Sequence, residues 1–183
     1  FALDAPVSRI EAMGGDALVV TDSDDLDFLT LALGGAQPAL SDRLTLGRLG
    51  EAEERSHAFF YRPDLSAPDG RSGLIGLPVM TWNDLGDEGA DMLFARRTDG
   101  VLERFGRLQS HGGGDRDDDC QASCVDWYGN ARPIFLGDRI LALLGYELVE
   151  GVAGDKRIEE AGRIDLAPPP RAARPVVPAH GGD

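Results

Sequence analysis

Alternation of hydrophobic and polar residues is the feature of this sequence that most constrains its fold. The alternation runs at a period of two in short pieces, most of which end at glycine or aspartate. Because successive side chains of a strand point to opposite faces, this period is typical of strands, whereas an amphipathic helix needs a period of about 3.6. The pattern predicts an all-β protein of short antiparallel strands. We expect strands at residues 8–13, 17–21, 26–33, 42–46, 58–61, 73–80, 91–97, 101–108, 132–136, 139–144, 146–150 and 157–166.

One of these segments fits two descriptions. Leu102, Phe105 and Leu108 recur at intervals of three, which is compatible with one face of a helix. Gly106 interrupts that face, and Asp99-Gly100 stands between two alternating runs, which is a strong signal for a β-hairpin. We therefore predict that the segment is a strand.

The predicted strands fall into three groups of four, at about residues 8–48, 56–109 and 122–166. In the first and last groups a Gly-Asp turn, at residues 15–16 and 137–138, leads into an apolar strand, which makes a weak internal repeat. Repeated four-stranded antiparallel units are typical of the blades of a β-propeller. The sequence therefore predicts about three propeller-like blades.

Two segments differ from the strands in composition. Residues 47–55 are rich in Glu and Gly and are predicted to be a connection or a single helical turn. Residues 167–183 are rich in Pro and Gly and cannot build a core, so we expect a disordered tail. The predicted propeller-like domain spans residues 1–166. Because closed propellers have about four to eight blades, it is expected to be an open arc or part of a larger propeller.

The charge of the chain argues against several kinds of partner. The sequence has 32 Asp and Glu against 18 Lys and Arg, a formal net charge of -14 and a pI near 4.5. A surface this negative repels nucleic-acid phosphates and anionic lipid headgroups, so we expect neither as a partner. No apolar run approaches the roughly 20 residues that a membrane helix needs, and no export signal is recognisable in this segment.

The candidate metal ligands are four aspartates, and calcium is the cation that they suit. Asp115, Asp117, Asp119 and Asp126 fall at positions one, three, five and twelve of an EF-hand-like count. Position six, which should be glycine, is Cys120, and no flanking helix is predicted. A solvated acidic loop is the alternative. We expect no resident cofactor, and calcium stays open as a ligand of this loop.

Catalytic residues are not predicted anywhere in the chain. Ser56 and His57 are neighbours, and neighbours on a strand point to opposite faces and cannot act as a serine–base pair. His111 lies beside a glycine-rich run, a mobile setting unsuited to a preorganised site. The aromatic side chains that could line a ligand groove, or pack in the core instead, are those of Trp82, Trp127 and Tyr128.

A family resemblance is carried by five stretches, at residues 8–14, 55–63, 73–79, 120–135 and 137–148. These stretches resemble bacterial secreted proteins that carry a C-terminal β-propeller domain. The resemblance implies a propeller fold and export, but no characterised reaction. It identifies the chain as the C-terminal portion of a longer protein that is secreted or held in the cell envelope.

Export would place the two cysteines in an oxidising compartment. Under that condition a disulfide between Cys120 and Cys124 is predicted. Four extended residue steps span about 13 Å, whereas a disulfide tolerates about 4.4–6.8 Å between Cα atoms, so the pair requires a bend at residues 121–123. The alternative is a reduced pair of buried cysteines.

Two functions remain for a chain of this kind. The first is a non-catalytic interaction scaffold that binds a protein or a surface glycan through loops at one end of its blades. The second is a propeller-type enzyme, a hydrolase or a lyase, with its site in the central channel. The absence of predicted catalytic residues favours the scaffold.

Overall fold

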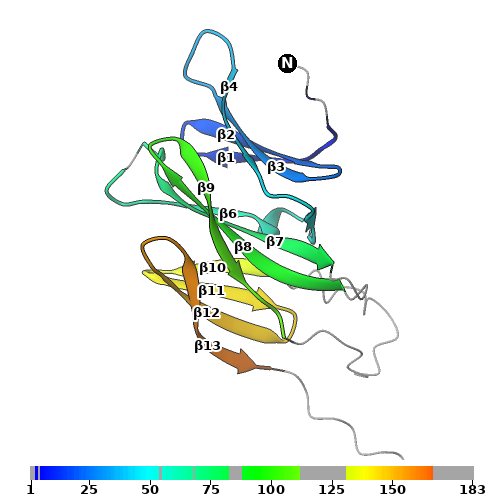
Figure 1. Cartoon of the computed structure of the whole chain (residues 1–183). Helices are drawn as coiled ribbons and strands as arrows, with labels where there is room; N and C mark the ends of the chain where they lie inside the picture. The colour runs from blue at the N-terminus through cyan, green and yellow to red at the C-terminus, as the bar shows by residue number, and fades with distance from the viewer. Residues whose placement is uncertain are drawn as a thin grey trace, which may run out of the picture.

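The computed structural model describes residues 3, 5–53, 55–67, 69–82, 88–111 and 131–166. Within these ranges the chain forms thirteen β-strands and a short 3-10 helix, η1 (Ser56–Ala58), and it contains no α-helix. The strands build three antiparallel sheets, each with its strands in sequence order (Figure 1). The predicted all-β fold of three propeller-like blades is therefore confirmed, and no sheet in this part of the chain closes on itself.

The first sheet, sheet A, contains four strands of equal length. They are β1 (Val7–Met13), β2 (Asp16–Asp22), β3 (Leu26–Ala32) and β4 (Ala39–Thr45). Short connections explain the sequence order. The two-residue connection between β1 and β2 can only return the chain antiparallel to the strand before it, and the connections after β2 and β3 have three and six residues.

The middle sheet, sheet B, fills one of its four strand positions with two short pieces. Both β5 (Gly50–Glu51) and β6 (Phe60–Pro63) pair with the same edge of β7 (Gly73–Trp82), because β8 (Glu88–Thr98) occupies its other edge. The sheet ends with β9 (Val101–Leu108). Sheet B is therefore a four-stranded blade whose first strand is interrupted by η1.

Three local predictions can be compared with sheet B. The segment 47–55 is more than a connection, because it contributes strand β5. Ser56 and His57 lie in the 3-10 helix rather than on a strand. Residues 101–108 form a strand, and Asp99-Gly100 is the hairpin turn before it, with left-handed φ angles of +51° and +93°.

The last sheet, sheet C, repeats the layout of sheet A. Its strands are β10 (Arg132–Leu136), β11 (Arg139–Leu144), β12 (Glu147–Ala153) and β13 (Ile158–Asp165). Each strand pairs with the next one along the chain.

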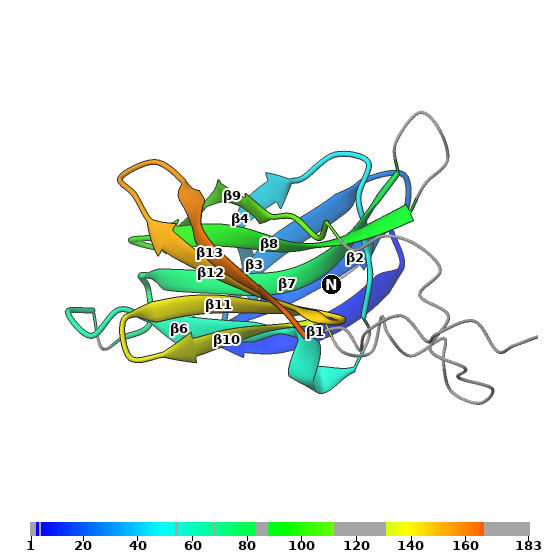
Figure 2. The same ribbon diagram turned by 90° about the horizontal axis from the view of Figure 1, so that it is seen from below.

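The three sheets stack face to face, with sheet B in the middle (Figures 1 and 2). Two apolar clusters fill the two interfaces. The cluster between sheets A and B includes Leu18, Phe28 and Leu77, and the cluster between sheets B and C includes Phe94 and Val149. Since alternate residues of a strand face opposite sides, the central strands β7 and β8 of sheet B carry apolar residues on both faces.

A left-handed glycine stands before the second full strand of each sheet, at the same distance along the chain from a leucine of that strand. Gly14, Gly70 and Gly137 have φ angles of +66°, +71° and +60°, and each precedes the second full strand of its sheet. In all three sheets a leucine follows four residues later. Leu18 packs in the A–B core and Leu74 in the B–C core, so these two leucines each face the next sheet of the stack.

The stack has two ends that differ in their connections. The turns at residues 14–15, 64–72 and 137–138 lie at one end, which we call the turn end. Because the strands alternate in direction, the connections at residues 23–25, 83–87, 112–130 and 145–146 start and finish at the other end, which we call the loop end.

Candidate functional site

Most of the residues predicted to form a site lie outside the described residues. These are Asp115, Asp117, Asp119, Asp126, Cys120, Cys124, Trp127 and Tyr128. Trp82 ends β7, where its backbone pairs with Glu88, but its side chain also lies outside the described part. The calcium loop, the disulfide and the aromatic groove therefore stay predictions.

The described ranges place charged side chains at the interfaces between the sheets instead. Arg9 of β1 is buried and reaches across to β5 of sheet B. Its Nε donates to Oε1 of Glu51 at 2.5 Å, and its Nη2 donates to the carbonyl oxygens of Glu53 and Arg55 at 2.8 and 3.1 Å. Its Nη1 pairs with Glu11 at 2.9 Å. The guanidinium is thus fully engaged in joining sheet A to sheet B.

A second buried arginine joins the same two sheets at the turn end. Arg97 of β8 is 1% exposed, and its guanidinium forms an ion pair with Asp16 of sheet A. Its Nη1 also donates to the carbonyl oxygens of Met13 and Gly70, at 3.2 and 2.9 Å. Tyr61 donates its hydroxyl to the same Gly70 oxygen at 2.7 Å, and burial raises the pKa of that hydroxyl. This arginine fixes the first turns of two blades to each other.

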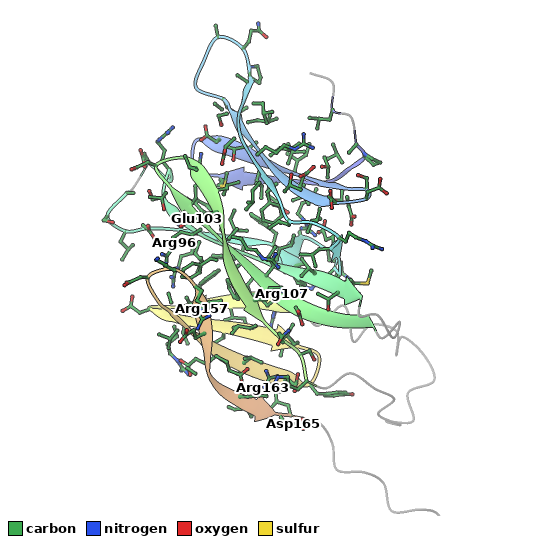
Figure 3. All side chains as sticks on the ribbon, viewed as in Figure 1. Arg96, Glu103, Arg107, Arg157, Arg163 and Asp165 are labelled. Carbon is green, nitrogen blue, oxygen red and sulfur yellow. The ribbon has the colours of Figure 1, made fainter. Side chains whose placement is uncertain are left out.

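The chain passes from sheet B to sheet C at the loop end, where a third ionic cluster lies. Asp91 at the start of β8 is buried, and its Oδ2 pairs with Nη1 of Arg107 on β9 at 3.1 Å. The backbone N–H of Ser110 approaches Oδ1 of Asp91 at 3.4 Å. Figure 3 shows Arg107 near this end of β9. Asp91 therefore anchors the segment that leaves sheet B.

Glu147 of β12 anchors the same segment from sheet C. Its Oε2 accepts hydrogen bonds from Ser110 Oγ and from the backbone N–H of His111, both at 2.9 Å, and pairs with Nη1 of Arg163 at 2.9 Å. Arg163, labelled on β13 in Figure 3, also donates through Nη2 to the carbonyl oxygen of Gln109 at 2.7 Å. Residues 109–111 are thus clamped between two sheets. The backbone N–H of His111 is held by Glu147, whereas the glycine-rich run beside it, on which the predicted mobile setting rests, lies outside the described residues.

The two buried carboxyls of this cluster have opposite pKa shifts. Burial raises the pKa of Asp91, and the charge of Arg107 and the Ser110 N–H only partly offset that effect. Burial also acts to raise the pKa of Glu147, but the hydrogen bonds from His111 and Ser110 and the charge of Arg163 outweigh it, so the pKa is lowered. Glu147 is therefore held as a carboxylate, whereas Asp91 is the group here that takes up a proton more readily.

Arginines also hold sheet C at the turn end. Arg62 of β6 donates to the carbonyl oxygen of Gly137 at 3.1 Å. Arg96 of β8 donates to the carbonyl oxygens of Gly154 and Asp155, at 3.1 and 2.7 Å, and its guanidinium lies 3.7 Å from the ring centroid of Phe105. These arginines lock the hairpins of sheet C onto sheet B.

Comparisons with known proteins add no family to this description. Neither protein-family models, nor curated proteins, nor solved structures gave a match to this chain. Within the described ranges no three His, Cys, Asp or Glu side chains are grouped so that they could hold a metal ion. None of the helices in that part of the chain is long and apolar enough to cross a membrane.

The clamp at the loop end was missed by sequence reasoning, although a signal for it exists. Val149 on β12 and Leu93 on β8 face the cores, so Glu147 and Asp91, two residues before them, stand at positions expected to be apolar. A charged residue at a core-facing position indicates a buried partner. The partners themselves come from other strands, and only the structure identifies them.

Proposed function

We propose that this chain is a non-catalytic interaction domain of propeller type, from an exported bacterial protein, that binds a protein or a surface glycan at its loop end. The clamp on residues 109–111 is the observation that carries the proposal. It gives the connection 112–130 a fixed starting point on the sheets, with Asp91 and Glu147 on either side. Loops presented by a rigid sheet framework are the common way in which β-folds bind partners.

The engagement of the buried charges supports a structural role for them. Arg9, Arg97 and Glu147 each make three or more polar contacts with the protein itself, mostly across a sheet interface. A general base or an acid must keep a free position for substrate. Most of the donors and acceptors of these side chains join the blades, and Nε of Arg97 is buried without a hydrogen-bond partner.

A propeller-type hydrolase or lyase is the second candidate, and the pKa of Asp91 is the observation that favours it. A buried carboxyl with a raised pKa is the kind of group that serves as a general acid. Asp91 also lies near Ser110 at the loop end, which the first proposal assigns to binding.

A printed array of surface glycans and an array of immobilised peptides test the two candidates together. The experiment compares the wild-type chain with a variant in which residues 112–130 are replaced by a Gly-Ser linker of equal length. We expect wild type to bind one class of probe and the linker variant to lose that binding. Leu65→Glu is the matched control, because the Leu65 side chain is fully exposed at the opposite end of the stack, and this variant should bind as wild type does.

The same arrays identify an enzyme if there is one. Release of shortened or unsaturated sugars or of cleaved peptides by wild type, with loss of release in Asp91→Asn, would establish the hydrolase or lyase instead. Equal binding by wild type and the linker variant would contradict the assignment of binding to the loop end.

The export part of the proposal has its own test. If the natural protein is exported, the chain recovered from the producing cell should contain the Cys120–Cys124 disulfide and be two hydrogens lighter than the reduced chain by mass spectrometry. Labelling of both thiols in the non-reduced protein would contradict it.

A further inference from the structure

The repeat marked by the left-handed glycines shows that one face of sheet C has no sheet packed against it in the described part of the chain. Leu18, four residues after Gly14, faces sheet B, and Leu74, four residues after Gly70, faces sheet C. Leu141 stands four residues after Gly137. Its neighbour Ile140 packs in the B–C core, and neighbouring residues of a strand face opposite sides, so Leu141 points away from sheet B. In the described part of the chain no sheet lies on that side of sheet C.

The outer face of sheet C carries an apolar patch that reaches all four strands, beside the ion pair of Arg139 with Glu150 on the same face. Ile134 pairs with Leu141, and Leu143 pairs with Leu148, which pairs in turn with Ile164. Ile164 is 56% exposed, and most of the other side chains of this face are half-buried. An apolar band of this extent on the open face of a sheet marks an interaction surface.

The outer face of sheet A is the counterpart of that face. Val19 stands five residues after Gly14, and its equivalent in sheet B, Ile75, faces the preceding sheet. Val19 lies in one cross-strand row with Ile10, Leu29 and Arg43. Ile10 on the edge strand is 66% exposed, whereas Val19 and Leu29 on the two middle strands are buried. The outer face of sheet A is thus equivalent to the face of sheet B that packs against the preceding sheet in the chain.

We propose that the outer face of sheet C binds the outer face of sheet A of a second copy of this chain, and that two copies close into a six-sheet ring. This contact has the same order of faces as the two interfaces already inside the chain. Face-to-face pairing of two C sheets has no precedent in the stack. Head-to-tail contacts form a closed ring when the rotation between successive copies brings the last copy back against the first. Six sheets lie within the usual range of about four to eight blades.

The charges at the loop end agree with this order. Arg132 at the start of β10 is exposed, and it lies on the outer face because its neighbour Pro133 is buried. The turn between β2 and β3 carries Asp24 and Asp25 at the same end of sheet A. Stacking A on C in the orientation used within the chain brings opposite charges to the same end of the new interface.

Light scattering coupled to size-exclusion chromatography tests the proposal on the chain as it stands. Wild type should elute at about 39 kDa, twice the chain mass of 19.5 kDa. Ile164→Glu and Ile10→Glu each place a charge on one of the two faces at an exposed position, and each should elute at the mass of one chain. Leu65→Glu adds the same charge at the 99% exposed turn and should stay dimeric.

Mixing the two variants separates the head-to-tail contact from other arrangements. In a mixed pair, one interface carries both substitutions and the other carries neither, so dimer mass should reappear on mixing. Three results would overturn the proposal: a wild-type monomer, which would leave these faces to a different partner; dissociation by Ile164→Glu alone, which would indicate pairing of two C faces; or no recovery on mixing. The far-ultraviolet circular dichroism of each variant checks that its sheets are intact.

Discussion

A Cβ placed on Gly70 would lie 2.5 Å from the Cα of Gly14, so the first turns of sheets A and B touch backbone to backbone. Both glycines have a left-handed φ, which side chains disfavour, and neither position leaves room for one. The contact places the carbonyl oxygens of Met13 and Gly70 within reach of Arg97, which donates to both. Sheets A and B can therefore approach this closely at the turn end because Gly14 and Gly70 have no side chains.

Gly70→Ala should destabilise the protein strongly. The left-handed backbone costs a non-glycine residue about 1–2 kcal/mol, and overpacking against Gly14 adds about 1–3 kcal/mol. We expect the free energy of unfolding, measured with urea, to fall by about 2–5 kcal/mol. Gly137→Ala is the control, because its φ is also left-handed but a Cβ there meets nothing within 4 Å. Equal losses in the two variants would show that the contact with Gly14 contributes nothing.

Arg97→Met tests the buried ion pair below that contact. The substitution leaves Asp16 and two carbonyl oxygens without their donor, and removing one member of a buried pair costs about 3–5 kcal/mol. Adding Asp16→Asn should recover part of the loss in the urea midpoint, because it removes the uncompensated charge. A double variant no more stable than Arg97→Met would argue that the charge of Asp16 is not the cause.

The strand pattern of this fold could be predicted from sequence because it depends on local signals. The period of two located the strands, and Asp99-Gly100 decided a segment that otherwise resembled a helix. Strand β5 was missed, because two residues are too short to show a period. Its pairing with β7 is a long-range contact, which local sequence does not reveal.

The internal repeat was recognised at the wrong register. The Gly-Asp pairs align Gly15 with Gly137, which matches Leu18 with Ile140 although these residues face opposite neighbours in the stack. The left-handed φ of Gly14 shows that Gly14 is the true equivalent of Gly137. A slip of one residue exchanges the two faces of every strand, so the sequence predicted blades but not which faces remain open.

The candidate site was less predictable than the fold for a related reason. Sequence reasoning looked for chemistry-bearing residues close together in the chain. The clamp at the loop end joins Asp91, Ser110 and Glu147, which come from three separate parts of the chain. Their convergence depends on how two sheets stack, and that information is spread over the whole apolar pattern.

The two buried carboxyls of the clamp should change stability with pH in opposite directions. The folded pKa of Glu147 lies below its ordinary value of 4.5, so its contribution to stability is present above that value and is lost as the pH falls through the folded pKa. The folded pKa of Asp91 lies above its ordinary value of 3.8, so its ionisation opposes folding as the pH rises above that value.

Urea unfolding of Glu147→Gln and Asp91→Asn across the acid range measures this difference. The stability of wild type relative to Glu147→Gln should grow as the pH rises towards 4.5 and then level off. The stability of wild type relative to Asp91→Asn should decline as the pH rises from 3.8 through the folded pKa of Asp91. Parallel curves for the two variants would contradict the opposite shifts.

Arg96→Ala should release the hairpin between β12 and β13 without unfolding the sheets. Arg96 donates to the carbonyl oxygens of Gly154 and Asp155 and stacks on Phe105, and at this half-exposed site the contacts are worth about 1–2 kcal/mol together. Since 1.4 kcal/mol is a factor of ten in an equilibrium constant, we expect amide hydrogen exchange near residue 154 to accelerate by about 5- to 30-fold.

Arg96→Lys keeps the charge but not the two-pronged donor, so it should recover only part of the protection. Exchange in the β1–β2 turn, which Arg96 does not touch, should be unchanged. Equal exchange near residue 154 in wild type and Arg96→Ala would show that the hairpin holds its place on sheet B without this arginine.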